Sequence, residues 1–296
     1  ICYLQNKYQM KQIKIFIELT RLNKPIGFML LFWPCLWGLT LAYYFNTEAN
    51  LYLKNLILFF LGSVLMRSAG CIFNDIVDKN LDRKVKRTKK RPIASRKISI
   101  FKSFIYIIVL CLIAFIILLQ FNLLTIFLGL GSMVLAFSYP FMKRITYWPQ
   151  LFLGLTFNWG IIMSWTSMTN HISVEPIILY VAAIFWTLGY DTIYGLQDIR
   201  DDEIIGVKST SIKFKNNPKA FVGSCYCLSI LIILILCFIM EIDKYFLPLS
   251  ALFIFSLIYQ IKIFEINKPK TCLVAFKFNN LTGLLIFIFI FSFNLQ

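Results

Sequence analysis

Charged side chains are scarce in this chain of 296 residues. Asp, Glu, Lys and Arg together make up 15% of it, against roughly 25% in a soluble globular protein. Hydrophobic residues make up 59%, which leaves too little polar surface to cover a water-soluble particle of this size. A soluble enzyme, a secreted disulfide-stabilised domain and a disordered chain are therefore excluded. The composition predicts an all-α, polytopic membrane protein, because helices satisfy their own backbone hydrogen bonds in lipid.

Histidine is almost absent, and the cysteines do not occur in metal-binding pairs. His171 is the single histidine, no CxxC motif occurs, and six of the eight cysteines lie within apolar stretches. Zinc binding and a disulfide framework are therefore not expected, and we interpret the cysteines as small buried apolar residues. The sequence also supplies no Ser/His/Asp arrangement for nucleophilic catalysis.

Continuously apolar stretches dominate what is present. Nine of them are long enough, or nearly so, to cross a hydrocarbon core of about 30 Å as helices. Strands are not expected, because the residues of transmembrane strands alternate in polarity. We predict one membrane domain over residues 25–293, preceded by a basic N-terminal segment, residues 1–24. The stretches are approximately 25–45, 53–78, 101–119, 122–142, 148–169, 173–197, 219–240, 245–261 and 271–293.

Basic residues gather on one side of this nine-helix arrangement. The N-terminus and the loops after the second, fourth, sixth and eighth stretches hold 27 of the 30 Lys and Arg residues. The opposite loops hold only Lys54 and Lys244, and Arg67 lies inside the second stretch. An excess of Lys and Arg is typical of the cytoplasmic or matrix face of a membrane. Because these basic loops are short, we expect no nucleic-acid binding.

Eight of the 14 acidic residues fall into two clusters, and both clusters reach the basic face. The first lies at the end of the second stretch and contains Asp75, Asp78 and Asp82, together with Asn74. On a helix, Asn74, Asp78 and Asp82 share one face because they follow each other at intervals of four residues. Arg67 lies two turns deeper on the same stripe.

The second cluster lies at the end of the sixth stretch. It contains Asp191, Asp198, Asp201, Asp202 and Glu203. Asp191, Asp198 and Asp202 are separated by seven and then four residues, so on a helix they also share one face.

Stacked carboxylates near a bilayer repel each other, so a positive charge must compensate them. Hard oxygen ligands in an incomplete shell suit Mg²⁺, which bridges carboxylates to substrate phosphates. The two clusters therefore predict two Mg²⁺ ions that hold one diphosphate. We expect direct contacts to the phosphate oxygens from Arg67, Lys208 and some of Lys86, Arg87, Arg91 and Arg96.

Several motifs surround these residues. The first cluster reads NDxxDxxxD from Asn74, and the second reads YDTxYGxQDxxDDxxxGxKST from Tyr190. An RLNKPIG segment begins at Arg21, and a Pro-Gln pair begins at Pro149. Over about residues 18–293 the pattern resembles the UbiA superfamily of intramembrane prenyltransferases. Within that superfamily it is most similar to the branch that prenylates 4-hydroxybenzoate.

The resemblance implies a nine-helix bundle around a central cavity, dependence on Mg²⁺ and a lipid-facing entrance for an isoprenoid tail. It also implies particular site residues. Arg67 and Tyr139 match residues of the family's site. The implied metal and diphosphate ligands are Asn74, Asp75, Asp78 and Asp82 in the first motif and Asp191, Asp198 and Asp202 in the second.

The implied reaction transfers a polyprenyl group from polyprenyl diphosphate to the ring of 4-hydroxybenzoate, on the route to ubiquinone. In our hypothesis Mg²⁺, its ligands Asp78 and Asp198, and basic residues stabilise the leaving diphosphate. The faces of Tyr139 and Tyr194 stabilise the allylic cation in a cavity that excludes water. A carboxylate or diphosphate oxygen takes the ring proton. The sequence leaves open whether Arg67 contacts diphosphate or the benzoate carboxylate.

Two alternatives remain: a UbiA-type enzyme with another acceptor, and a membrane cation transporter. The transporter is disfavoured because the acids lie near helix ends, beside long basic loops. The chain begins at Ile1 with a basic segment, which indicates the remainder after a transit peptide. We expect the mitochondrial inner membrane with the active face toward the matrix, or alternatively a bacterial inner membrane with a cytoplasmic active face. Association with other ubiquinone-pathway enzymes is a further expectation.

Overall fold

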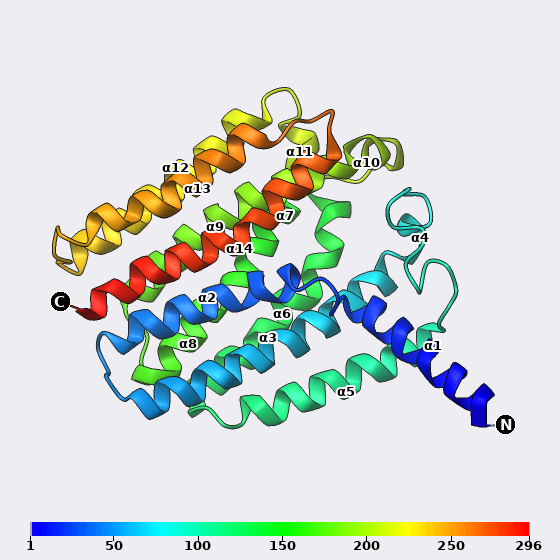
Figure 1. Cartoon of the computed structure of the whole chain (residues 1–296), viewed down its shortest axis with the longest axis horizontal. Coiled ribbons are helices and arrows are strands. Elements are labelled where there is room, and N and C mark those ends of the chain that lie inside the picture. The colour runs from blue at the N-terminus through cyan, green and yellow to red at the C-terminus, as the bar shows by residue number, and fades with distance from the viewer. Residues whose placement is uncertain (1, 296) are drawn as a thin grey trace.

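The chain folds into long helices that lie side by side (Figure 1). The computed structural model describes residues 2–295, with side chains from residue 9 onward, and every regular element in that range is helical, as predicted. The α-helices are α1 (Cys2–Thr20), α2 (Ile26–Tyr43), α3 (Ala49–Val77), α4 (Lys79–Asp82), α5 (Ile100–Leu118), α6 (Leu123–Ile145), α7 (Pro149–Asn158), α8 (Gly160–Thr169), α9 (Val174–Gly195), α10 (Ile199–Ile205), α11 (Thr210–Lys213), α12 (Pro218–Ile239), α13 (Ser250–Ile263) and α14 (Pro269–Ser292). Short 3-10 helices are η1 (Leu196–Asp198), η2 (Leu247–Leu249) and η3 (Phe293–Leu295).

Seven helical segments in the described part are long and apolar enough to cross a bilayer: α2, α3, α5, α6, α9 with its extension to Ile205, α12, and α14 with η3. The other two predicted crossings are shorter. The stretch at 148–169 is divided into α7 and α8 at Trp159, and the stretch at 245–261 forms η2 and α13. The predicted polytopic helical architecture is therefore confirmed, but the count of nine crossings is not.

The outer surface of these helices is apolar. Phe127 and Val134 on α6 are 63% and 74% exposed, and Phe238 near the end of α12 is 85% exposed. Large apolar patches of this kind are disfavoured in water. They indicate a surface that contacts lipid tails.

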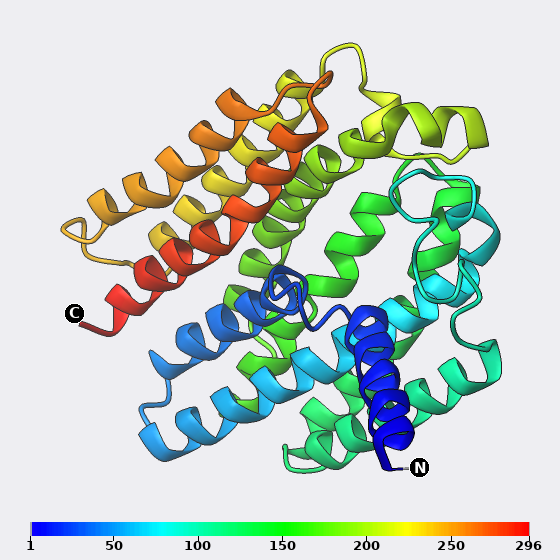
Figure 2. The same ribbon diagram turned by 45° about the vertical axis from the view of Figure 1, so that its right-hand side comes forward.

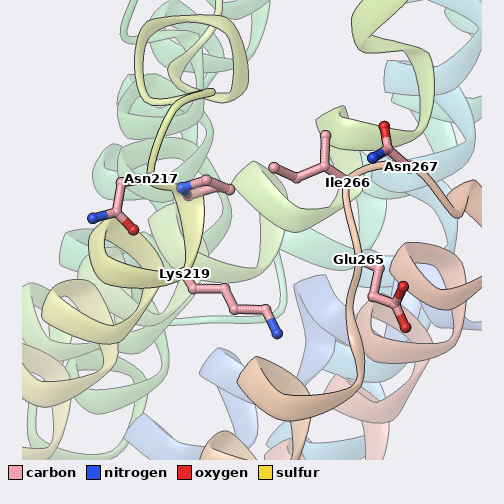
Figure 3. Close-up of a pocket in the computed structure, with 6 residues that line it drawn as sticks. Asn217, Lys219, Glu265, Ile266 and Asn267 are labelled. Carbon is pink, nitrogen blue, oxygen red and sulfur yellow. The ribbon is translucent and has the colours of Figure 1, made fainter.

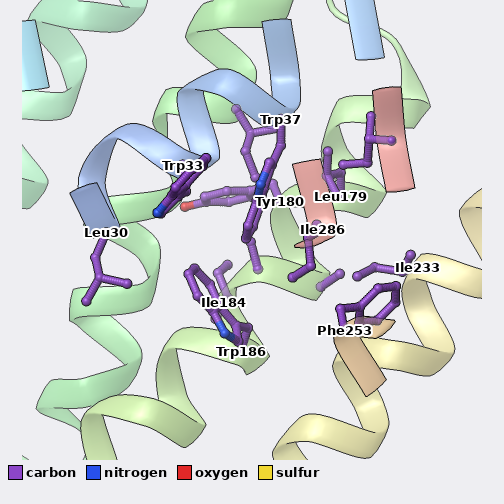
Figure 4. Packing of buried hydrophobic residues seen from close by; sticks show 14 of the residues in the cluster. Leu30, Trp33, Trp37, Leu179, Tyr180, Ile184, Trp186, Ile233, Phe253 and Ile286 are labelled. Carbon is purple, nitrogen blue, oxygen red and sulfur yellow. The ribbon is translucent and has the colours of Figure 1, made fainter. Parts of the chain in front are cut away.

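Aromatic side chains from α2, α9 and α13 lie close together in the main core (Figure 4). The rings of Trp37 and Trp186 lie 5.0 Å apart, and the Trp37 indole N–H donates to the Gly283 carbonyl at 2.9 Å. A Cβ atom at Gly283 would lie 2.5 Å from the Trp33 ring. Glycine at this position therefore lets α14 approach α2 closely.

A buried polar network joins α9, α12, α13 and α14. The Gln260 side-chain oxygen accepts hydrogen bonds from the Tyr226 hydroxyl at 2.8 Å and from Asn279 Nδ2 at 2.9 Å. Gln260 Nε2 donates to Thr282 at 2.8 Å, and the Trp186 indole donates to Asn279 Oδ1 at 2.9 Å. Hydrogen bonds between helices away from water fix their relative positions along the bundle.

The N-terminal segment forms a helix that the sequence did not predict. In Figure 2 the dark blue α1 lies against α3. Ile15 and Leu19 are buried in a second core with Ile72 of α3 and Ile107 of α5. The segment is basic in composition, yet it contributes an apolar stripe to the packing of the bundle.

Candidate active site

The two acidic clusters lie at one end of the bundle, and residues 83–99 after α4 connect them. Arg87 Nη2 lies 2.5 Å from Asp198 Oδ2, and the backbone N–H of Lys86 donates to Asp201 Oδ2 at 2.9 Å. These contacts link the segment after the first cluster to η1 and α10, which carry most of the second. The proximity expected for the two helix ends is therefore observed.

In the first cluster, Asp75 and Asp82 pair with arginines. Asp75 Oδ1 lies 2.5 Å from Arg21 Nη2 and 3.1 Å from Arg91 Nη1. Arg91 Nη1 also lies 2.9 Å from Asp82 Oδ2. Both carboxylates are almost completely buried, so these ion pairs compensate charges that would otherwise be very unfavourable.

Asp78 interrupts the helix that was expected to carry the first cluster. Its φ and ψ angles are −91° and 4°; α3 ends just before it and α4 begins just after it. Its carboxylate forms an ion pair with Lys143, and Arg144 Nη2 lies 3.6 Å from Asp78 Oδ1. The helix that carries Asn74, Asp78 and Asp82 is therefore interrupted at Asp78, although the Asp78 N–H still donates to the Asn74 carbonyl and the Asp82 N–H to the Asp78 carbonyl.

The second cluster also extends over a change of helix type. Asp191 lies in α9, Asp198 ends the 3-10 helix η1, and Asp202 lies in α10. A 3-10 turn is tighter than an α-helical turn and changes the phase of the residues that follow it. The three residues therefore lie on successive helical segments and not on one continuous α-helix.

A large cavity reaches this end of the bundle. Its volume is about 1430 Å³, more than the roughly 300–1,000 Å³ of typical small-molecule pockets. Side chains from α2, α3, α5, α6, α9 and α14 line it, and most are apolar. Of the predicted site residues, those that line it are Arg67, Asn74, Arg87, Arg91, Tyr139, Asp191 and Tyr194, whereas Asp75, Asp78, Asp82, Asp198 and Asp202 do not line it. A cavity with one polar end and apolar walls suits an amphiphile with an anionic head.

Arg67 lies in the wall of this cavity. Its guanidinium carbon is 5.2 Å from the centre of the Phe157 ring, and its buried Nε atom has no hydrogen-bond partner. A Cβ atom at Gly27 would lie 3.1 Å from that Nε atom, so glycine provides the space that Arg67 occupies. Arg67 is therefore held by an aromatic face and retains an N–H for a ligand.

The two predicted tyrosines differ in their surroundings. Tyr194 accepts a hydrogen bond from Arg87 Nη1 at 3.0 Å, and the Arg87 guanidinium lies 5.2 Å from the centre of its ring. Tyr139 lies in α6 and lines the cavity. Both tyrosines therefore contribute to the cavity wall.

Lys208 does not line the cavity. Its ammonium donates to the Ile145 carbonyl at 3.1 Å, and its backbone N–H donates to the Lys143 carbonyl at 2.9 Å. It thus connects the segment after α10 to the end of α6, beside the Lys143–Asp78 ion pair. Its expected contact with diphosphate stays a prediction.

The donor set suits a divalent cation bound together with a diphosphate. Among the described side chains, no three Asp, Glu, His or Cys residues form a metal site by themselves. Mg²⁺ usually needs only one or two carboxylates plus substrate phosphates and water. The buried Oδ1 atom of Asp78 accepts no hydrogen bond. Burial keeps the pKa of Asp82 above its ordinary value despite Arg91, and the neighbouring Asp75 and Asp78 raise this pKa further.

Several basic residues near the site were not predicted to belong to it. Arg21 and Lys143 form ion pairs with Asp75 and Asp78. The sequence signals were the RLNKPIG motif at Arg21 and the Lys143-Arg144 pair after α6, but neither indicates which carboxylate is bound. Lys277, counted among the cations of the basic loops, lies inside α14 and lines the cavity.

A second hollow of about 360 Å³ lies between the start of α12 and the α13–α14 loop (Figure 3). Lys219 and Glu265 lie on its sides. Glu265 is the only acid of this hollow and already pairs with Lys268 at 2.9 Å. This hollow has no counterpart of the paired acidic clusters, so we place the site in the large cavity.

Comparisons with known proteins agree with this placement. A family model described as the UbiA prenyltransferase family matches residues 31–282. A 4-hydroxybenzoate octaprenyltransferase of Pseudomonas aeruginosa (strain UCBPP-PA14) is 38% identical over 273 residues, which cover 92% of this chain and 91% of that protein. The mitochondrial 4-hydroxybenzoate polyprenyltransferase of Homo sapiens is 41% identical over 283 residues, which cover 94% of this chain and 75% of that protein.

Solved structures share the fold. A UbiA homolog from Aeropyrum pernix K1 has a TM-score of 0.74 at 21% identity, covering 89% of this chain and 97% of its own. A UbiA homolog from Archaeoglobus fulgidus bound to GPP and Mg²⁺ has a TM-score of 0.69 at 18% identity, covering 95% of this chain and 100% of its own. The chain therefore belongs to the UbiA prenyltransferase family and is a membrane enzyme that transfers prenyl groups.

Proposed function

We propose that this enzyme transfers a polyprenyl group from polyprenyl diphosphate to 4-hydroxybenzoate and forms 3-polyprenyl-4-hydroxybenzoate for ubiquinone synthesis. The observation that carries the proposal is the single cavity that joins Asn74 and Asp191 at its polar end to long apolar walls. The names of the bacterial and human relatives support 4-hydroxybenzoate as the acceptor. Family membership removes the cation transporter from consideration.

We assign the divalent metal to oxygen ligands from both clusters. The Archaeoglobus relative bound to Mg²⁺ and GPP supports Mg²⁺ as the ion. When bound, Mg²⁺ neutralises charge that develops on the leaving diphosphate. The candidate ligands are Asn74, Asp75, Asp78 and Asp82 from the first cluster and Asp191, Asp198 and Asp202 from the second.

Basic side chains complete the diphosphate site. Arg87 and Arg91 line the cavity while they pair with carboxylates, so they lie within reach of a phosphate head. Arginine binds phosphate oxygens through two parallel N–H groups, which orients the head as well as neutralising it. The unpaired Nε atom of Arg67 adds a donor deeper in the cavity.

The reaction follows from these charges. The allylic C–O bond breaks and its electron pair leaves with the diphosphate, where cations stabilise it. The apolar walls keep water from the allylic cation, and the ring faces of Tyr139 and Tyr194 stabilise it by about 0.5–2 kcal/mol each. A ring carbon ortho to the phenol hydroxyl forms the new C–C bond. The displaced ring proton passes to a carboxylate or diphosphate oxygen.

The membrane position suits the substrate. A polyprenyl chain gains about 0.8 kcal/mol for each CH₂ group in hydrocarbon, so the donor stays in the bilayer. We place the enzyme in the mitochondrial inner membrane with a matrix-facing site, or alternatively in a bacterial inner membrane with a cytoplasmic one. A human relative named as mitochondrial and a bacterial relative support these two locations. Contact with other ubiquinone-pathway enzymes is part of this proposal.

The test is reconstitution of the purified chain in liposomes with Mg²⁺, a polyprenyl diphosphate and 4-hydroxybenzoate. Mass spectrometry should detect 3-polyprenyl-4-hydroxybenzoate, and its formation should require both substrates. Homogentisate and 1,4-dihydroxy-2-naphthoate serve as competing acceptors in parallel reactions. Product with one of these and none with 4-hydroxybenzoate would assign the enzyme to another acceptor.

A further inference from the structure

The basic residues that line the cavity are Arg21, Lys24, Arg67, Arg87, Lys90, Arg91 and Lys277, of which Lys24 and Lys90 lie outside the membrane-spanning helices. Arg21, Arg87 and Arg91 form ion pairs with carboxylates of the two clusters. Among the described residues, two cavity-lining cations within membrane-spanning helices form no ion pair with a carboxylate, and these are Arg67 and Lys277. Arg67 lies in α3, which ends in the first acidic cluster, and its guanidinium packs on the Phe157 ring. Lys277 lies on a different wall.

Lys277 lies on a face of α14 that is turned toward the cavity. Leu273, Phe276, Lys277 and Asn280 all line the cavity, and their spacing of three, four and seven residues defines one helical face. Lys277 lies about 12 Å along the axis from the start of α14, at a rise of 1.5 Å per residue. A lysine so far inside a spanning helix is unfavourable unless it binds something, and by default it indicates a functional site.

The neighbours of Lys277 suit a small aromatic acid. Phe276 precedes it and packs against Tyr194, with ring centres 4.4 Å apart. Asn280 Oδ1 accepts a hydrogen bond from the indole N–H of Trp33 at 2.9 Å. The amide N–H groups of Asn280 therefore point away from Trp33. This helix face thus offers an aromatic wall, one ammonium and one amide donor. These groups match an aromatic ring that carries a single carboxylate.

We propose that Lys277 binds the carboxylate of the aromatic acceptor and that Asn280 donates a second hydrogen bond to it. The proposal rests on the proposed function and names the residues that select a carboxylated acceptor. The diphosphate already has the cations of the two clusters, so it needs no contact with α14. The acceptor ring is then held along α14, and its carbon ortho to the phenol meets the allylic cation.

The experiment compares Lys277→Met with the matched control Lys262→Met, an exposed lysine in the last turn of α13 that does not line the cavity. Each variant is assayed in liposomes with 4-hydroxybenzoate and with its uncharged methyl ester. A hydrogen bond to a charged group is worth about 1.5–3 kcal/mol, so Lys277→Met should raise KM for 4-hydroxybenzoate about ten- to hundredfold. KM for the methyl ester and for the prenyl diphosphate should stay unchanged, and Lys277→Arg should restore most of the affinity.

Equal changes with acid and ester, a raised KM for prenyl diphosphate, or no change with either acceptor would overturn the role of Lys277. Equilibrium binding of radiolabelled 4-hydroxybenzoate without prenyl diphosphate gives a second readout, in which Lys277→Met should bind more weakly than Lys262→Met. The wild-type chain separates the two hypotheses. If it fails to prenylate 4-hydroxybenzoate, the proposed function is wrong. If it succeeds and Lys277→Met shows no selective loss, only this inference is wrong.

Discussion

Arg87 binds Asp198 through two of its nitrogens, with Nε 2.8 Å and Nη2 2.5 Å from Oδ2. The two residues are 111 positions apart in the sequence, and their pairing joins the loop after α4 to the end of η1. The same guanidinium donates to the Tyr194 hydroxyl at 3.0 Å. One side chain thus connects a candidate metal ligand with a ring of the cavity wall.

Replacement of Arg87 by lysine should weaken use of the prenyl donor. Lysine keeps the charge but cannot reproduce the planar pair of N–H groups. We expect kcat/KM for prenyl diphosphate to fall about tenfold in Arg87→Lys and up to a hundredfold in Arg87→Ala. Steady-state kinetics at saturating 4-hydroxybenzoate measure this. An unchanged kcat/KM in Arg87→Ala would show that Arg87 only holds Asp198.

Removal of the charge at Asp78 should abolish most of the turnover. Asp78→Asn keeps the size of the side chain but removes one oxygen ligand and the partner of Lys143. Metal ions contribute several kcal/mol to charge stabilisation in such reactions, so kcat should fall at least about a hundredfold. The control is Glu203→Gln, which breaks the exposed ion pair with Lys215 at the same end of the bundle. Comparable losses in both variants would argue against a specific metal role.

Chelation of divalent ions should stop the reaction without unfolding the protein. Asp75, Asp78 and Asp82 are paired with basic side chains of the chain itself, so the fold does not require the ion. Treatment with EDTA should abolish product formation and leave Tm nearly unchanged, as measured by thermal unfolding in detergent. Mg²⁺ with pyrophosphate should then raise Tm, because a ligand that binds only the folded state stabilises it. A large loss of Tm in EDTA alone would instead indicate a structural ion.

Gln260 should be important for stability rather than for chemistry. Gln260→Leu removes the partner of Tyr226, Asn279 and Thr282. Interhelical hydrogen bonds in membranes are worth about 0.6–2 kcal/mol each, so Tm should fall clearly while KM for both substrates changes little. The matched control is Gln120→Leu on the exposed turn before α6, which should leave Tm near the wild-type value. Equal Tm values in the two variants would contradict a stabilising network.

The acidic clusters, the helical class and the face on which the site lies were predictable, because long apolar stretches and helical spacing are local properties. The ion-pair partners of the carboxylates could not be predicted from the sequence. Arg21 and Asp75 are 54 residues apart, and no spacing rule joins an N-terminal arginine to that carboxylate. Lys277 was assigned to a loop because charge counting registers the side of the membrane and not the depth. The ion pairs of Asp78 join it to cations at the end of α6, which lie far from it in the sequence.

α1 illustrates the same limit. Its composition is basic and only mildly apolar, so a search for long apolar stretches passes over it. Ile15 and Leu19 become buried only because α3 and α5 offer a complementary surface. Tertiary packing thus determines whether a segment with a weak local apolar pattern forms a helix.

The pairing of buried carboxylates with the chain's own cations has a consequence for biogenesis. A newly made copy can enter the bilayer and complete its helical packing before it meets any metal or isoprenoid. Its charges are already balanced at that stage by Arg21, Arg91 and Lys143. We therefore expect assembly of the enzyme to be independent of cofactor supply, so that only its turnover depends on a divalent metal.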